Sequence, residues 1–250
     1  MALLPDIKDA DSRKANFSVC LWFLPFRTVL LFFGQGLVYC YYLLAGQSSP
    51  WLLAGKWWSV WGNFSDLGCL LVLIILLRRE GLVLSDLFKP VTKKVLRSGL
   101  LFLMITAPFS ALGSVLASWI AYGNWHADLL PGALYGRHLP LWGILYSFFI
   151  WAPIWSVTEE MTYNGYLAGR IEQYTNRRWL TLLLVCFWWA LQHIFLPFIP
   201  NWHYFAWRFI SFVPCVLALV IIYLKRRNLG GLVIAHLIMD MGAVAATIAY

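Results

Sequence analysis

The sequence predicts an all-α fold, a polytopic membrane helix bundle with about seven transmembrane helices. Its 250 residues are 61% apolar, 18% aromatic and only 12% charged, whereas a soluble domain is nearer half apolar and a quarter charged. The apolar residues form long runs, and a spanning helix needs about 20 of them. Basic residues cluster in short segments between the runs, which is typical of cytoplasmic membrane loops.

Seven runs are long enough to be considered as spans: 17–44, 57–77, 99–122, 141–174, 179–196, 204–224 and 229–249. The fourth run would form a helix about 50 Å long at 1.5 Å per residue, so it must tilt, kink or protrude. Pro153 predicts a kink within it. The basic loop at 81–99 suggests a surface segment, and a surface or re-entrant segment would raise the number of membrane segments to eight.

The positive charges predict the orientation of the chain. Sixteen of the nineteen Lys and Arg residues fall on one side if the N-terminus is cytoplasmic, the exceptions being Lys56, Arg137 and Arg208. This bias favours a cytoplasmic N-terminus and, with an odd number of spans, an external C-terminus. Arg27 and Arg208 are expected near span ends, with side chains that reach the membrane surface. The predicted location is the plasma (inner) membrane if the chain is bacterial.

Composition also argues against several classes of partner. The net charge of +8 lies in membrane loops, so no nucleic-acid partner is expected, and the predicted partners are membrane lipids and a peptide or membrane-protein substrate. The five cysteines are scattered without a CxxC pair, so they carry no metal-binding signature. The polar start of the chain and the absence of a small-residue cleavage site predict no cleavable signal peptide.

Six ionisable residues inside the spans are the candidates for function, because such residues are costly in lipid and usually face the bundle interior. They are Asp66, Glu159, Glu160, His193, His236 and Asp240. Counted from the nearest cytoplasmic basic residues, Glu159, His193 and His236 lie about 16, 22 and 13 Å deep. All three depths fall within a hydrocarbon core of about 30 Å, so a common site is predicted. Asp66 is expected to make a hydrogen bond inside the bundle.

Helical spacing predicts which of these side chains share a face. His236 and Asp240 are four residues apart and lie on one face of the last span. Glu160 and Asn164 are also four apart. Glu159 is about 100° round the helix from Glu160, so the two acids are predicted to point in different directions.

The segments TEEMTYNG, WWALQH and AHLIMD follow one another along the last four predicted spans. In this order they resemble the motifs of the CPBP family (CAAX proteases and bacteriocin-processing proteins, also called ABI), which includes the type II CAAX prenyl endopeptidases. The three segments resemble EExxxR, an aromatic residue four before a histidine, and HxxxN or HxxxD. The matching positions are Glu159, Glu160 and Asn164, then Trp189 and His193, then His236 and Asp240.

The resemblance implies a catalytic core of about four spans over residues 141–250, preceded by N-terminal membrane helices over residues 1–140. It implies that Glu159 and His193 activate a water, and that His236 and Asp240 stabilise the oxyanion. It implies a glutamate-type protease without a cofactor. Two histidines and a glutamate also suit zinc, which stays open as the less favoured alternative because the chain has no HExxH.

Two departures from the motifs change the expected charge of the site. Asn164 stands where the motif has arginine, and Asp240 stands where many relatives have asparagine. Three neighbouring carboxylates cannot all stay ionised in a low dielectric without compensation. Three remedies are open: one acid is protonated, a histidine is an imidazolium, or a divalent cation binds.

The predicted function is an intramembrane endopeptidase. Its substrate is a prenylated C-terminus, a signal or bacteriocin peptide, or another membrane protein. One alternative is a non-catalytic family scaffold, which the two departures favour. A less favoured alternative is a proton-coupled transporter, because intramembrane acids and histidines can relay protons, although the chain shows no inverted repeat.

Overall fold

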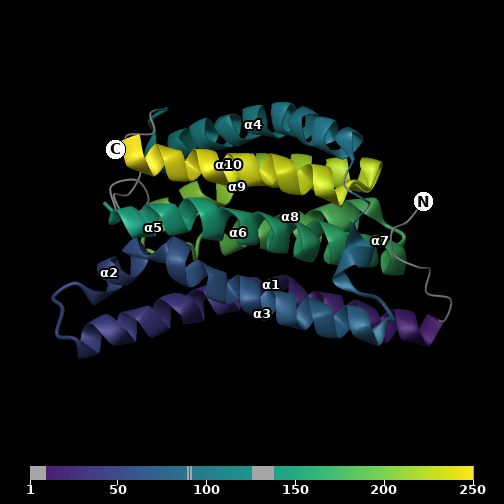
Figure 1. The fold of residues 1–250 in the computed structure, drawn as a ribbon, viewed down its shortest axis with the longest axis horizontal. Coiled ribbons are helices and arrows are strands. Elements are labelled where there is room, and N and C mark those ends of the chain that lie inside the picture. Colours follow the sequence, from purple (N-terminus) through teal and green to yellow (C-terminus); the bar gives the residue numbers. More distant parts are fainter. Residues whose placement is uncertain (1–9, 89, 91, 126–137, 250) are drawn as a thin grey trace.

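The fold is a bundle of roughly aligned helices (Figure 1). The computed structural model describes residues 10–88, 90, 92–125 and 138–249. Among these residues, six helical segments are long and apolar enough to cross a membrane, so the chain is an integral membrane protein and the predicted all-α polytopic bundle is confirmed. They are α1 (Ala10–Leu44), α3 (Trp58–Arg79), α4 (Lys93–Tyr122), the composite segment Leu141–Thr175, α9 (Trp202–Arg226) and α10 (Leu229–Ala249).

The basic connections gather at one end of the bundle. The beginning of α1, the connection from α3 to α4, and the turns before α8 and α10 lie at the end marked N, and the C-terminus lies at the opposite end (Figure 1). The α3–α4 connection contains the short 3-10 helix η1 (Leu84–Leu87), and α2 (Pro50–Lys56) lies at the other end. The basic segments of the sequence therefore lie at one end of the bundle.

The fourth predicted span is one continuous helical segment whose backbone widens twice. It comprises α5 (Leu141–Tyr146), the π-helix η3 (Ser147–Trp151), α6 (Ala152–Glu159), the π-helix η4 (Glu160–Ala168) and α7 (Gly169–Thr175). The first widening comes just before Pro153, which cannot donate an α-helical hydrogen bond. The second begins at Glu160, and π-turns are frequent at functional sites.

The fifth predicted span is shorter than expected. Helix α8 (Arg178–Gln192) has 15 residues, about 22 Å, and ends at the candidate site instead of continuing to residue 196. Pro197 and Pro200 explain the early end, because proline breaks a helix and disfavours helical backbone in the residue before it. Residues 193–201 continue without a regular helix to the start of α9.

Side chains from other elements satisfy this irregular backbone, as lipid requires. Arg208 donates to the carbonyl oxygens of His193 (3.0 Å) and Leu196 (2.7 Å). The Gln35 amide pairs with both the N–H (2.7 Å) and the carbonyl (3.1 Å) of Phe198. Arg208 is only 7% exposed, so the expectation that it extends to the membrane surface is wrong, because its donors are needed inside the bundle.

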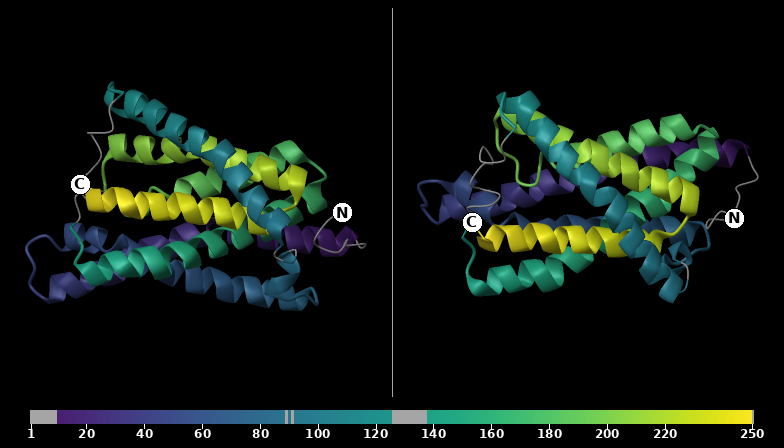
Figure 2. Two further views of the ribbon diagram at one scale, coloured as in Figure 1. Left: turned by 45° about the horizontal axis from the view of Figure 1, so that its top comes forward. Right: turned by 90° about the horizontal axis from the view of Figure 1, so that it is seen from above.

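Helix α4 crosses α9 and α10 obliquely (Figure 2) and packs closely on both of them. Glycines make the contacts close. A Cβ added to Gly99 would lie 2.7 Å from the side chain of Ile234, and one added to Gly113 would collide with the carbonyl oxygen of Ser211. This packing brings α4 against the cavity described next.

Candidate functional site

A cavity of about 190 Å³ lies inside the bundle. Helices α3, α4, α6, α8, α9 and α10 and the π-helix η3 all contribute to its lining, and aromatic and aliphatic side chains form most of the wall. Its acidic, basic and imidazole lining residues are Glu159, His193, Arg208, His236 and Asp240. Four of the predicted site residues therefore share one cavity, with Trp189 beside them and Glu160 behind its wall.

Glu159, the last residue of α6, is completely buried and accepts hydrogen bonds from α8. Trp189 Nε1 donates to Oε2 at 2.8 Å, and Gln192 Nε2 donates to Oε1 at 2.6 Å. Each carboxylate oxygen can accept about two hydrogen bonds, so both keep room for a further donor such as water. The two α8 donors fix the carboxylate plane at the cavity wall.

Glu160, the first residue of η4, is also completely buried. Its Oε2 accepts a hydrogen bond of 2.7 Å from Asn164 Nδ2, one helical turn further on. Its Oε1 lies 3.2 Å from His236 Nδ1. Asn164 therefore provides a neutral donor to Glu160 at the position where the motif has a cation.

His236 lies between three carboxylates. Beyond Glu160, its Nε2 is 3.5 Å from Glu159 Oε2 and 3.6 Å from Asp240 Oδ2. Of the two glutamates only Glu159 lines the cavity, yet both reach the same imidazole, one at each of its nitrogens. The π-turn that begins at Glu160 changes the helical phase after Glu159. A doubly protonated ring fits this arrangement, because each nitrogen faces an acceptor.

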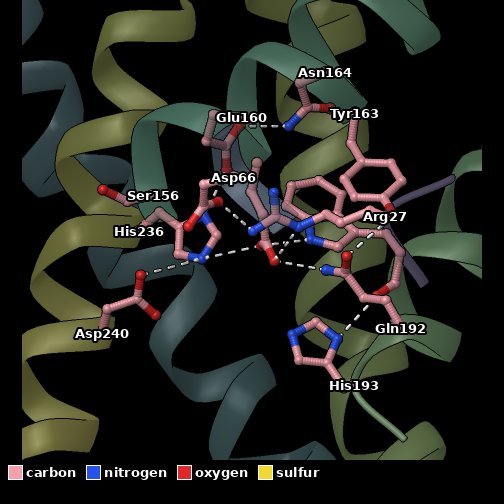
Figure 3. Close-up of polar contacts among 12 residues, drawn as sticks. Arg27, Asp66, Ser156, Glu160, Tyr163, Asn164, Gln192, His193, His236 and Asp240 are labelled. Carbon is pink, nitrogen blue, oxygen red and sulfur yellow. Dashed lines mark hydrogen bonds and ion pairs between the residues drawn. The ribbon is translucent and has the colours of Figure 1, made fainter. Parts of the chain in front are cut away.

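His193 follows the last residue of α8, and its orientation is set locally. Its Nδ1 lies 2.8 Å from the carbonyl oxygen of Trp189, so Nδ1 carries the proton that this acceptor requires and Nε2 is left as an acceptor. The ring stacks on Phe212 with centroids 3.4 Å apart. Figure 3 shows His236 and Asp240 on one side and Gln192 and His193 on another.

The first span contributes a charge that the sequence did not suggest. Arg27 of α1 is completely buried, its Nη2 donates to Asp66 Oδ1 at 2.6 Å, and its Nε lies 3.5 Å from Glu159 Oε1. The expectation that Arg27 lies near a span end is therefore wrong, because two buried acids hold it inside. The bundle-internal partner expected for Asp66 is confirmed, and it is Arg27.

Two further residues at this site were missed from the sequence. Gln192 bonds Glu159, and Tyr163 in turn donates to Gln192 Oε1 at 3.1 Å. Tyr163 also stacks on Trp189 with centroids 5.0 Å apart. Gln192 directly precedes His193, so its place beside the motif was the available signal, but only the fold shows that it points at Glu159.

No group of three or more His, Cys, Asp or Glu side chains is arranged to hold a metal ion among the residues that the structure describes. The acids around His236 contact its nitrogens and Asn164, and Glu159 also contacts donors from α8 and α1. Of the remedies expected for the crowded carboxylates, the arrangement fits an imidazolium at His236, and Arg27 adds a cation that the sequence analysis had not considered.

The comparisons with known proteins agree with the motifs. Residues 137–242 match the family model described as Type II CAAX prenyl endopeptidase Rce1-like. No curated protein and no solved structure matches the chain. The matched residues include Glu159, Glu160, His193, His236 and Asp240, which surround the buried site. This match supports the assignment of the segment to the CPBP family of CAAX-type intramembrane proteases.

Proposed function

We propose that this protein is an endopeptidase that hydrolyses a peptide bond inside the membrane with a water activated by Glu159 and His193. The observation that carries the proposal is that the wall of one cavity holds Glu159, His193, His236 and Asp240. A carboxylate and an imidazole that share a water form a general base. A cavity lined by polar groups also provides the water that hydrolysis in lipid needs.

The hydrogen bonds support separate roles for the two groups of the base. Glu159 retains acceptor capacity on both oxygens, and His193 presents Nε2 as an acceptor because Nδ1 faces a carbonyl. Glu159 removes a proton from the water while His193 orients it, and the hydroxide attacks the carbonyl carbon. The same proton then passes to the leaving amine nitrogen as the C–N bond breaks, which yields a carboxylic acid and an amine and returns Glu159 to its starting state.

His236 is proposed to stabilise the oxyanion. Its Nε2 is 3.5 and 3.6 Å from the nearest carboxylate oxygens, longer than the usual 2.7–3.2 Å of an N–H···O hydrogen bond. The Nε2–H is therefore available to a substrate oxygen, and such a donor in a low dielectric contributes several kcal/mol. Asp240 orients His236 from one turn further along α10.

The cavity wall favours a substrate with an apolar portion beside its scissile bond. Four tryptophans line the cavity in addition to Trp189: Trp58, Trp151, Trp155 and Trp207. A peptide carrying an isoprenoid near its C-terminus has this chemistry, and so does a segment of a membrane protein. We propose the lipidated peptide as the first substrate to test, because the family model is named for prenyl endopeptidases.

The test is cleavage of a farnesylated C-terminal CAAX peptide by the full chain in proteoliposomes, with the unlipidated peptide and a transmembrane peptide as comparison substrates. Glu159→Gln and His193→Ala are expected to lower kcat by roughly 10²- to 10⁴-fold, the size of a general acid–base contribution. Glu172→Gln is the matched control, because Glu172 lies on the same helical segment but pairs with Arg178 and Arg227 away from the cavity.

Cleavage that survives both Glu159→Gln and His193→Ala would refute the proposed mechanism. If the wild-type protein cleaves no substrate while its biological effect survives both changes, the scaffold alternative is favoured. We also propose that the reaction uses no metal. Activity that is lost in a zinc chelator and restored by zinc would contradict that proposal.

A further inference from the structure

Arg27 lies behind Glu159 and not in the cavity wall. Its guanidinium is completely buried and lies over the ring of Trp155, 4.1 Å from the centroid. Its Nη2 is held by Asp66 of α3 at 2.6 Å. Arginine is planar and always charged, so these two contacts fix the direction in which its remaining donors point (Figure 3).

One of those donors is directed at Glu159. Arg27 Nε lies 3.5 Å from Glu159 Oε1 and makes no hydrogen bond within the part of the chain that the structure describes. Its attraction to Glu159 is therefore not shared with a closer acceptor. Trp189 and Gln192 of α8 and His236 of α10 also contact this carboxylate, and Arg27 adds a contact from the first helix of the chain.

The buried carboxylates of this site need a positive charge nearby, and the motif position that has arginine in the family holds a neutral residue here. Asn164 is neutral and satisfies only one oxygen of Glu160. Glu159 and Glu160 are both completely buried, and Asp240 is close to both His236 and the cavity. A buried carboxylate without compensation is strongly unfavourable. Arg27 is the permanent cation nearest to Glu159 among the described ion pairs.

We infer that Arg27, held by Asp66, is a positioning residue that orients the Glu159 carboxylate and places a positive charge beside it, in place of the cation that the EExxxR motif has at the position of residue 164. This inference rests on the proposed function. It adds α1 to the site and gives α3 a second role there beside Trp58, although both helices lie outside the residues matched by the family model. The reacting groups of the matched segment thus depend on the N-terminal helices for their charge.

A purely structural Arg27–Asp66 pair is the competing explanation, because that contact is the shorter of the two. The double variant Arg27→Gln/Asp66→Asn separates them, since it removes both charges and leaves no unpaired partner. If Arg27 positions Glu159, the variant folds, its KM stays near the wild-type value, and its kcat falls by roughly tenfold to hundredfold, as expected when a reacting group is misplaced.

The matched control is Arg170→Gln/Glu80→Gln. It removes another buried arginine paired with an acid, at the end of the bundle away from the cavity. Its kcat per folded molecule is expected to be unchanged. Wild-type kcat in the Arg27/Asp66 variant, or an equal loss of kcat in the control, would overturn the inference.

Arg27→Lys decides the matter if the double variant does not fold. Lysine keeps a charge for Asp66 but cannot also direct a fixed Nε–H at Glu159, so kcat is expected to fall with KM unchanged. Wild-type kcat, or an unfolded Arg27→Lys protein, would assign Arg27 to folding alone and overturn the inference. Absence of any Glu159-dependent cleavage in the wild-type protein would instead refute the proposed function.

Discussion

At the scale of single residues, the neighbours of Glu159 determine what this carboxylate can do. Its two neutral donors, Trp189 and Gln192, come from one face of α8 near the end of that helix. They leave one acceptor site open on each oxygen. Tyr163 holds Gln192 in turn, so the orientation of the proposed base depends on a chain of hydrogen bonds and not on the acid alone.

Gln192→Met tests this dependence. Methionine has a similar length but no donor, so Glu159 Oε1 loses its 2.6 Å hydrogen bond. A hydrogen bond to a charged group contributes about 1.5–3 kcal/mol, and the expected result is a loss of roughly tenfold or more in kcat with little change in KM. Steady-state kinetics of the purified variant measure both constants.

Tyr163→Phe is the graded control for Gln192→Met, because it removes only the hydroxyl that holds Gln192 and keeps the ring stacked on Trp189. Its loss of kcat should be smaller than that of Gln192→Met. A Gln192→Met enzyme with wild-type kcat would show that Trp189 and Arg27 orient Glu159 without the amide.

The motifs predicted which acids and histidines share the cavity, but not the residues that support them. Arg27 lies ten residues inside a span that begins at Phe17, about 15 Å by helical rise. The same depth count that placed Glu159 in the hydrocarbon core therefore places Arg27 there as well. The contact between Arg27 and Glu159 could not be predicted in the same way, because a single sequence does not show which helices are neighbours.

At the scale of elements, the apolar pattern predicted the long helices well and the fifth span poorly. Residues 193–201 are mostly as apolar as the residues of a membrane helix, yet two prolines follow the end of α8. Side chains from other elements make the hydrogen bonds that the backbone of this segment lacks. Hydropathy reports burial and not backbone geometry. The early end of α8 matters because it places His193 at the cavity and not within a continuous helix.

Gly113→Ala tests the close packing that holds α4 against α9. The added methyl group would meet the carbonyl oxygen of Ser211, which belongs to the backbone of α9 and cannot move alone. Overpacking of this kind costs about 1–3 kcal/mol. The variant should unfold at a lower temperature in detergent, and its activity should also fall because Ser110 and Ser114 of α4 line the cavity.

Gly36→Ala is the matched control for Gly113→Ala. Gly36 is also inside a membrane helix, but an added Cβ would meet nothing within 4 Å. Since alanine favours a helix by up to about 1 kcal/mol over glycine, its thermal midpoint should stay the same or rise. Equal midpoints for the two variants would show that α4 can move away from α9 without cost.

At the scale of the whole molecule, the sequence predicted the six long membrane helices and their charged ends, because both follow from the cost of polar groups in lipid. The other predicted span, 179–196, corresponds to the shorter α8. Arg27 lies inside the bundle, which leaves fifteen of the sixteen basic residues assigned to the cytoplasmic side. The connections that carry most of them lie at the end where α1 begins (Figure 1). Short α8 and the irregular segment after it together connect the two ends of the bundle.

A topology experiment tests whether α8 and the irregular segment after it together cross the membrane. The positive charges predict a cytoplasmic N-terminus, and the ends of the chain lie at opposite ends of the bundle. A reporter fused after Tyr250 should therefore report the external side, whereas one fused after Asn176, in the turn between α7 and α8, should report the cytoplasm. If both fusions report the same side, residues 178–201 do not cross the membrane. The cavity that depends on His193 at mid-depth would then need a different placement in the bilayer.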